Sequence, residues 1–139
     1  MPLIEETLRA GKTVKFSPKG VSMLPMLRQG IDSVILAAPT GKLKKYDLPL
    51  YRRRNGLFVL HRVVKAGERY TCIGDNQFQL ERGISQEQII GVMVAFTRGK
   101  KQYAADHLGY WLYCRFWHYS RPIRRLWRGG ISRLRRLLK

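Results

Sequence analysis

Three residues that could together form a serine-hydrolase site occur in one order along the chain: Ser22, His61 and Asp75. In such a site the hydroxyl attacks a carbonyl carbon and the imidazole takes the hydroxyl proton. The carboxylate orients the imidazole and stabilises its charged form. Each residue lies in a short patterned context: Ser22-Met23-Leu24-Pro25, Val59-Leu60-His61-Arg62-Val63-Val64 and Gly74-Asp75-Asn76. One such residue alone would indicate nothing, but the ordered set predicts nucleophilic hydrolysis.

The elements that must position these residues are short strands. After a helix over residues 3–10, apolar residues in strand-like runs predict strands at 13–16, 33–38, 48–53, 57–64, 69–73 and 89–96. Asn55-Gly56 between two of these runs predicts a β-hairpin. Ser85-Gln86-Glu87-Gln88 predicts a capped turn of helix. Residues 1–98 are therefore expected to form a mainly β domain that carries all three chemical groups.

Residues 99–139 differ in composition from this domain. Gly99-Lys100-Lys101-Gln102 predicts a linker, and residues 107–119 are rich in aromatic side chains. The net charge is +18, all nine acids lie at or before Asp106, and nine Arg or Lys lie between Arg115 and Lys139. The tail also carries apolar residues at helical spacing: Ile123, Leu126, Trp127, Ile131, Leu134, Leu137 and Leu138.

This pattern predicts a basic amphipathic helix, which suits an anionic membrane surface contacted through residues 107–139. The alternative is a helix that packs on the β domain and exposes a solvated basic face, with Trp111, Trp117 and Trp127 in the core. No apolar run is long enough to span a membrane and no export signal is visible, so the sequence predicts a cytoplasmic protein held at the inner membrane face.

The ordered motifs resemble those of the type I signal peptidases. The resemblance is greatest to the endoplasmic-reticulum and archaeal branch, in which histidine replaces the lysine base of most bacterial members. It covers about residues 12–98, and residues 19–25, 50–56 and 89–91 agree as well. The related LexA-type repressors share the fold. The resemblance implies a coiled β-sheet fold, no cofactor or metal, and cleavage of a peptide or leader precursor after a small residue.

Carried onto this sequence, the family roles make Ser22 the nucleophile and His61 the general base. The structural alternatives are a turn serine or helix N-cap for Ser22 and a strand histidine bound to a backbone carbonyl for His61. His107 and His118 lie outside the resemblance, in the aromatic tail, and are interpreted as interfacial or structural. A histidine base titrates close to neutral pH without the strong desolvation that a lysine base needs.

The carboxylate of the site has two candidates. Asp75 matches the Gly-Asp-Asn motif, and Glu81 occupies the position of a second acid found in the eukaryotic branch. The sequence does not choose between them, because Asp75 could also brace a loop by accepting backbone N–H bonds.

The oxyanion and substrate groups are also taken from the resemblance. The Ser22 N–H would be one oxyanion donor, and Gly20 stands where some members carry a hydroxyl. The apolar cleft would be lined by Met23, Leu24, Pro25 and Val59, with core packing an equal alternative for Met23 and Leu24. Two departures are the missing N-terminal membrane span and Tyr46-Asp47 in place of a Gly-Asp pair.

Two other function classes remain open from the sequence. A catalytically silent relative could bind membrane or leader peptides. A nucleic-acid-binding module would suit the charge of +18, but the basic tail explains that charge more simply, so no nucleic acid is expected. Cys72 and Cys114 match no metal or redox motif and are expected to be free thiols, with a disulfide between them as the alternative.

Overall fold

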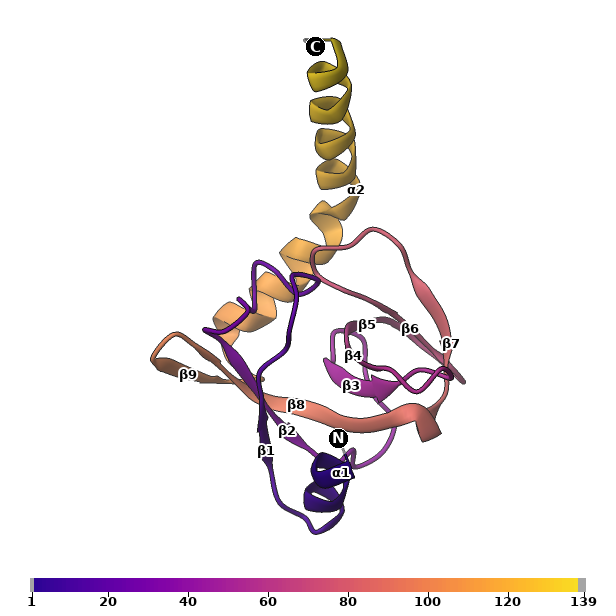
Figure 1. The fold of residues 1–139 in the computed structure, drawn as a ribbon, viewed down its shortest axis with the longest axis vertical. Coiled ribbons are helices and arrows are strands. Elements are labelled where there is room, and N and C mark those ends of the chain that lie inside the picture. The colour runs from indigo at the N-terminus through magenta and orange to yellow at the C-terminus, as the bar shows by residue number, and fades with distance from the viewer. Residues whose placement is uncertain (1, 138–139) are drawn as a thin grey trace.

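Two antiparallel sheets form the body of the protein, with one helix at each end of the chain (Figure 1). The computed structural model describes residues 2–137, without the side chains of Pro2, Ile131 and Ser132. The elements are α1 (Pro2–Arg9), β1 (Val14–Phe16), β2 (Ser33–Ala37), β3 (Pro49–Arg52), β4 (Phe58–Leu60), β5 (Arg62–Ala66), β6 (Tyr70–Ile73), β7 (Glu81–Ile84), a 3₁₀ turn η1 (Gln86–Gln88), β8 (Ile89–Arg98), β9 (Lys101–Ala104) and α2 (Leu108–Leu137). The expectation of a mainly β fold with a short N-terminal helix and a C-terminal helix is confirmed.

The larger sheet has the strand order β1-β2-β8-β3-β4, and β9 adds to β8. It curls into a half-barrel. Register shifts at Ile35/Leu36 and at Leu50/Tyr51 mark irregularities in the ladders that β8 makes with β2 and β3, and such bulges bend a sheet. Within the described residues, β1, β4 and β9 each pair on one side only, so all three are edge strands of this sheet.

The smaller sheet has the order β5-β6-β7. The chain passes into it directly from the larger sheet, because β4 ends at Leu60, β5 begins at Arg62, and His61 lies between them. The sequence predicted one strand over residues 57–64. The break at His61 corrects that prediction, and it places the histidine where the chain changes sheets.

Each sheet covers a hydrophobic core. One core contains side chains from α1, β2, β3, β8 and α2, including Leu8, Leu36, Leu50 and Met93. The other lies under the smaller sheet around Val63, Tyr70 and Cys72. A Cβ at Gly91 would stand 2.8 Å from Leu8 Cδ1, so glycine at this position lets α1 approach β8 closely.

The segment before α2 is a β-hairpin, which corrects the predicted linker at residues 99–102. Gly99 adopts a positive φ of 63° in the turn, and β9 pairs with β8 from Arg98↔Lys101 to Ala95↔Ala104. The polar composition of a tight hairpin turn resembles that of a linker, which explains the error.

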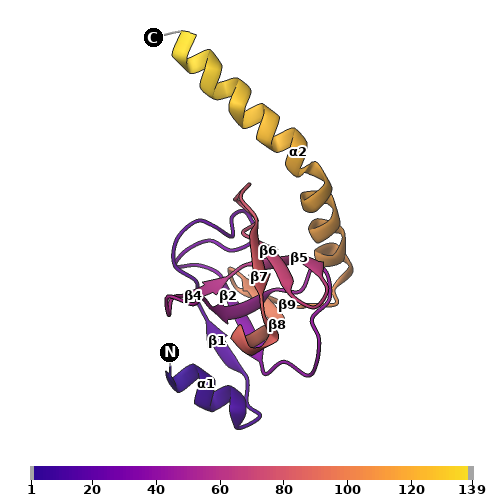
Figure 2. The ribbon, with the colours of Figure 1, turned by 90° about the vertical axis from the view of Figure 1, so that its right-hand side faces the viewer.

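Helix α2 packs on the body with its first half and projects away with its second half (Figures 1 and 2). Tyr110 and Cys114 of the first half are buried in the core. The helix bends between the halves, and Pro122 lies inside it, where proline removes a backbone hydrogen bond and kinks a helix. No helix among the described residues is long and apolar enough to cross a membrane. Leu138, assigned to the amphipathic tail from the sequence, lies outside the described residues, as does the side chain of Ile131.

Candidate functional site

Ser22 and His61 line the same surface hollow of about 470 Å³. Ser22 comes from the turns that follow β1, and His61 comes from the junction between β4 and β5. Among residues 2–137 no hydrogen bond links the Ser22 hydroxyl to another group or the His61 Nε2 atom to a partner. The remaining lining residues are Phe16, Ser17, Pro18, Lys19, Arg53, Phe58, Val59, Leu60 and Gln77.

The Ser22 turn is held by the Gly-Asp-Asn motif. Asn76 N–H donates to the Ser22 carbonyl at 2.8 Å, and Asn76 Nδ2 donates to the Val21 carbonyl at 3.1 Å. A Cβ at Gly74 would stand 2.6 Å from the Ser22 carbonyl oxygen, closer than real Cβ contacts. The glycine of the motif is therefore required for this approach, and the asparagine fixes it.

Two backbone N–H groups of the Ser22 turn, those of Gly20 and Ser22, differ in their hydrogen bonding. Gly20 has a positive φ of 87°, a conformation that glycine adopts without the strain other residues incur. Its N–H donates to Gln29 Oε1 at 3.0 Å, so Gly20 shapes the turn and is not an oxyanion donor. Within the part of the chain that the structure describes, the Ser22 N–H donates to no acceptor, which leaves it available to an incoming oxygen.

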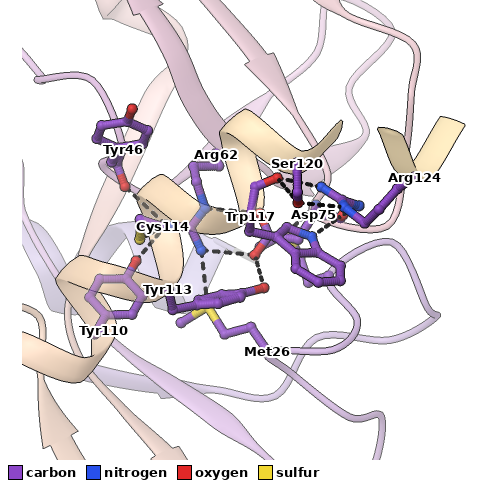
Figure 3. A network of polar contacts seen from close by, with 11 residues as sticks. Met26, Tyr46, Arg62, Asp75, Tyr110, Tyr113, Cys114, Trp117, Ser120 and Arg124 are labelled. Atoms are coloured by element: carbon purple, nitrogen blue, oxygen red, sulfur yellow. Dashed lines mark hydrogen bonds and ion pairs between the residues drawn. The ribbon is translucent and has the colours of Figure 1, made fainter. Parts of the chain in front are cut away.

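Asp75 binds Arg62 and does not contact His61. Its Oδ1 accepts from Arg62 Nε at 2.9 Å, and its Oδ2 accepts from Arg62 Nη2 at 3.0 Å. Both side chains are almost completely buried, at 2% exposure for Arg62 and 1% for Asp75. Tyr113 of α2 also donates to Asp75 Oδ2 at 2.7 Å, and Trp117 Nε1 donates to the Asp75 carbonyl at 2.6 Å. Figure 3 shows this network, which joins the motif to α2.

Glu81 is the carboxylate beside His61. Its Oε2 lies 3.8 Å from His61 Nδ1, and Tyr51 bridges the two groups. The Tyr51 hydroxyl donates to Glu81 Oε2 at 2.7 Å and lies 3.4 Å from His61 Nδ1. Arg53 completes the cluster, donating from Nε to Oε1 at 2.8 Å and from Nη2 to Oε2 at 2.9 Å of the same carboxylate.

The pKa values in this cluster follow from burial and from these contacts. Burial lowers the pKa of His61 to about 4; the Glu81 charge raises it and the Arg53 charge lowers it further. Burial raises the pKa of Glu81, but hydrogen bonds from Arg53 and Tyr51 outweigh burial and lower it overall. Burial and the hydrogen bond to Glu81 raise the pKa of Tyr51 well above its usual value. At neutral pH the imidazole is neutral, the carboxylate is charged and the phenol keeps its proton.

Three of the four predicted cleft residues do not line the hollow. Val59 does, whereas Met23 is 3% exposed and belongs to the hydrophobic core. Leu24 is half-buried outside the hollow, and Pro25 borders a different hollow with Phe96 and Tyr110. Met23 follows the core-packing alternative that the sequence left open, and the placement of Pro25 in the cleft is wrong. Burial of the apolar Met23 side chain in the core is favourable.

The sequence did not reveal Tyr51, Arg53 or Arg62. Tyr51 and Arg53 come from β3 and its end, and β3 pairs with β4 so that Tyr51 lies opposite Val59. The predicted Asn-Gly hairpin fixes this pairing. Residues at equal distances on either side of the turn pair with each other, so the hairpin would have placed Tyr51 near His61. Arg62 gave no such signal, because arginine is rarely buried unless it is paired.

The rest of the described chain offers no other obvious chemical centre. No cluster of three His, Cys, Asp or Glu side chains with metal-binding geometry occurs among the described residues. Cys72 and Cys114 are buried free thiols, and burial raises the pKa of both, so neither has the character of a reactive thiolate.

Comparison of the chain with models of protein families, with curated proteins and with solved structures finds no match.

Proposed function

We propose that the chain is a serine peptidase that cuts a peptide or leader sequence after a small residue, with Ser22 as nucleophile and His61 as general base. The observation that carries this proposal is the shared hollow, in which a serine and a neutral histidine both face the same space. The ordered motifs and the mainly β fold support membership of the signal-peptidase and LexA-like superfamily, in the branch with a histidine base.

The proposed reaction forms and hydrolyses an ester. Ser22 Oγ attacks the scissile carbonyl carbon while its proton passes to His61 Nε2. The C–N bond then breaks, the amine leaves with the proton from Nε2, and the acyl group remains on Ser22. A water molecule gives a proton to Nε2 and attacks the ester carbonyl carbon. The bond from this carbon to Ser22 Oγ then breaks, Oγ takes the proton back from Nε2, and the carboxylic acid is released. The Ser22 N–H stabilises the negative oxygen in both steps.

Glu81 and Tyr51 supply the orienting role. The Tyr51 hydroxyl donates its proton in a hydrogen bond to Glu81, so the tyrosine oxygen is free to accept a hydrogen bond from His61 Nδ1–H. That arrangement favours the tautomer protonated on Nδ1, which leaves a lone pair on Nε2 for the serine proton. The Glu81 charge then stabilises the imidazolium that forms. We assign the orienting role to Glu81 and a structural role to Asp75.

The surroundings of the hollow support an extended polypeptide as substrate. Phe16 comes from β1 and residues 58–60 form β4, and both are edge strands of the half-barrel sheet. A free edge strand offers unpaired backbone N–H and C=O groups, with which an extended peptide can form a ladder. Val59 provides an apolar wall for a small side chain. Hydrogen bonds between catalytic groups are commonly long in structures without substrate and shorten when substrate binds.

We place this activity in the cytoplasm at the inner membrane face, and the basic helix α2 supports that location.

The activity itself is tested with a mixed peptide library, with mass spectrometry of the products. Wild-type protein should cut after small residues, and Ser22→Ala and His61→Gln should each lower the rate by about 10³-fold or more. Ser120→Ala and His107→Gln, which remove the same groups outside the hollow, should cut normally. Binding without cleavage by the wild-type protein, or cleavage retained by Ser22→Ala, would refute the proposal.

A further inference from the structure

Helix α2 carries an apolar stripe along its outer side. Its nine members are between 53% and 82% exposed. At about 100° of rotation per residue they fall within a sector roughly 100° wide. The stripe consists of Leu108, Leu112, Phe116, Tyr119, Ile123, Leu126, Trp127, Leu134 and Leu137.

The stripe is separate from the face that packs on the protein body. In the first half of α2 the buried residues are Tyr110 and Cys114, with Tyr113 and Trp117 bonded to Asp75. These four residues lie outside the sector of the stripe, so the core leaves the stripe largely in solvent. In the second half, the side opposite the stripe carries the arginines at 124, 125, 128, 135 and 136.

The body fixes the direction of the projecting half. Arg124 donates to the Asp75 carbonyl at 3.4 Å and to the Trp117 carbonyl at 2.5 Å. Arg128 donates to Asn76 Oδ1 at 3.2 Å. The helix therefore leaves the body in a defined direction (Figure 2). Two residues of the stripe, Ile123 and Trp127, border a surface hollow beside Phe78 of the body but remain 70% and 72% exposed.

Charge limits what can cover the stripe. No acid occurs after Asp106, so a second copy of α2 packed along the stripe would bury the apolar side chains but leave the arginines on the outer sides of both helices with no partner charge. A nucleic acid would satisfy the arginines but would leave nine large apolar side chains in water. An anionic lipid surface satisfies both features, because the stripe enters the acyl region and the long arginine side chains reach the headgroups.

We propose that the apolar stripe and the arginines of α2 bind the surface of an anionic membrane, with the helix lying in the interfacial plane. The body then sits on the side of α2 away from the lipid, because Tyr110 and Cys114 hold it there. This proposal does not depend on the peptidase activity, since it uses none of the residues around the Ser22 hollow.

The test is flotation of the full chain with vesicles of phosphatidylcholine alone or mixed with phosphatidylglycerol. The mixed vesicles should bind about tenfold more tightly or better, because each basic residue near an anionic surface adds attraction. The triple variant Ile123→Ser, Leu126→Ser, Trp127→Ser should lose binding by about tenfold or more on both vesicles, since it removes interfacial apolar area. The matched variant Leu57→Ser, Leu80→Ser, Val94→Ser changes exposed apolar residues of the body and should bind like the wild type.

A second pair of variants separates the charge contribution. Arg125→Gln, Arg133→Gln, Arg136→Gln should weaken binding to the phosphatidylglycerol vesicles only. Lys42→Gln, Lys65→Gln, Lys100→Gln removes the same charge from exposed positions of the body and should bind nearly normally. Wild-type protein that fails to float, or a serine variant that floats like its control, would overturn the proposal. So would a dimer in analytical ultracentrifugation that disappears in the serine variant, because the stripe would then be a self-association surface.

Discussion

Arg62 and Asp75 form a buried ion pair through two hydrogen bonds of 2.9 and 3.0 Å. Arg62 begins β5 directly after His61, and Asp75 lies in the motif whose Asn76 N–H binds the Ser22 carbonyl. One anchor thus connects the strand that carries the proposed base to the turn that carries the proposed nucleophile. Tyr113 ties α2 to the same carboxylate.

The two acids should therefore respond differently to substitution. Asp75→Asn removes the charge that compensates a buried guanidinium, and breaking such a pair costs about 3–5 kcal/mol of stability. Glu81→Gln leaves a half-buried site that retains hydrogen-bonding groups, so the fold should lose little stability while the cleavage rate falls. Urea unfolding and peptide cleavage, measured on both variants, check the division.

The opposite pattern would contradict this assignment of roles. If Asp75→Asn unfolded at the wild-type urea concentration but lost all activity, and Glu81→Gln kept full activity, the orienting carboxylate would be Asp75. Asp106→Asn, at an exposed acid, serves as the control for both measurements and should behave like the wild type.

Arg53 should control the pKa of His61. Burial is the main cause of the low value of about 4, and the Arg53 charge lowers it further while Glu81 raises it. Arg53→Gln removes one cation and frees the Glu81 charge, so the His61 pKa should rise. Only the neutral imidazole accepts the serine proton, so the acid limb of kcat/KM should move to higher pH by the same amount. NMR titration of the His61 ring measures the pKa without relying on activity.

Arg54→Gln is the matched control, because Arg54 is exposed and next in sequence. It should leave the His61 titration almost unchanged. An unchanged titration in Arg53→Gln would show that the carboxylate, its arginine and the imidazole are not electrostatically coupled as described.

Gly74→Ala should disturb the Ser22 turn. The added Cβ would meet the Ser22 carbonyl oxygen at 2.6 Å, and this neighbour is backbone that cannot rotate away. Forcing the two apart should cost about 1–3 kcal/mol, as overpacking does, and should break the Asn76 bond to Ser22. The cleavage rate should fall by more than the fraction of unfolded protein at the assay temperature can explain. Gly67→Ala, whose Cβ has no neighbour closer than 3.8 Å, should preserve both properties.

Asp32 should make stability depend on acid pH. Hydrogen bonds from Arg28 are the main cause of a low Asp32 pKa of about 2. Burial of the carboxylate opposes this shift, and a hydrogen bond from Gly99 N–H adds to it. Its pKa when unfolded is about 3.9, so the unfolded chain binds more protons between these values. The resulting stability of about 2 kcal/mol is present above pH ~4 and disappears as pH falls through ~2. Asp32→Asn should therefore be destabilised at neutral pH, and its difference from wild type in urea unfolding should shrink toward low pH. A constant difference would contradict the assignment.

The sequence predicted the main strands because their apolar patterns reflect burial. The runs at 33–38 and 89–96 correspond to β2 and β8, and Asn55-Gly56 forms the expected hairpin. It missed β7, whose residues Glu81-Arg82-Gly83-Ile84 have no strand pattern. It also missed β9, whose polar residues pair at an exposed edge. These two strands depend on partners distant in sequence, which local patterns do not reveal.

The site was predictable to a similar extent. The motifs identified Ser22 and His61, which the structure brings to one hollow. The sequence did not predict the contacts of the two acids. Asp75 binds Arg62, whose burial the sequence does not indicate. Glu81 lies near His61 and is connected to it by Tyr51, which belongs to the other sheet. The contrast between Met23 in the core and Val59 in the hollow likewise depends on the fold of a turn that has no periodic pattern.

The most direct measurement is covalent transfer of an acyl group to Ser22. The protein would be mixed with the p-nitrophenyl ester of a short alanine peptide, quenched in acid and mapped by mass spectrometry. The account predicts a burst of p-nitrophenolate and a peptidyl group on Ser22, with both lost in Ser22→Ala and His61→Gln and both retained in Ser120→Ala. An unmodified Ser22 in the wild-type protein, or an equal burst from Ser22→Ala, would contradict it.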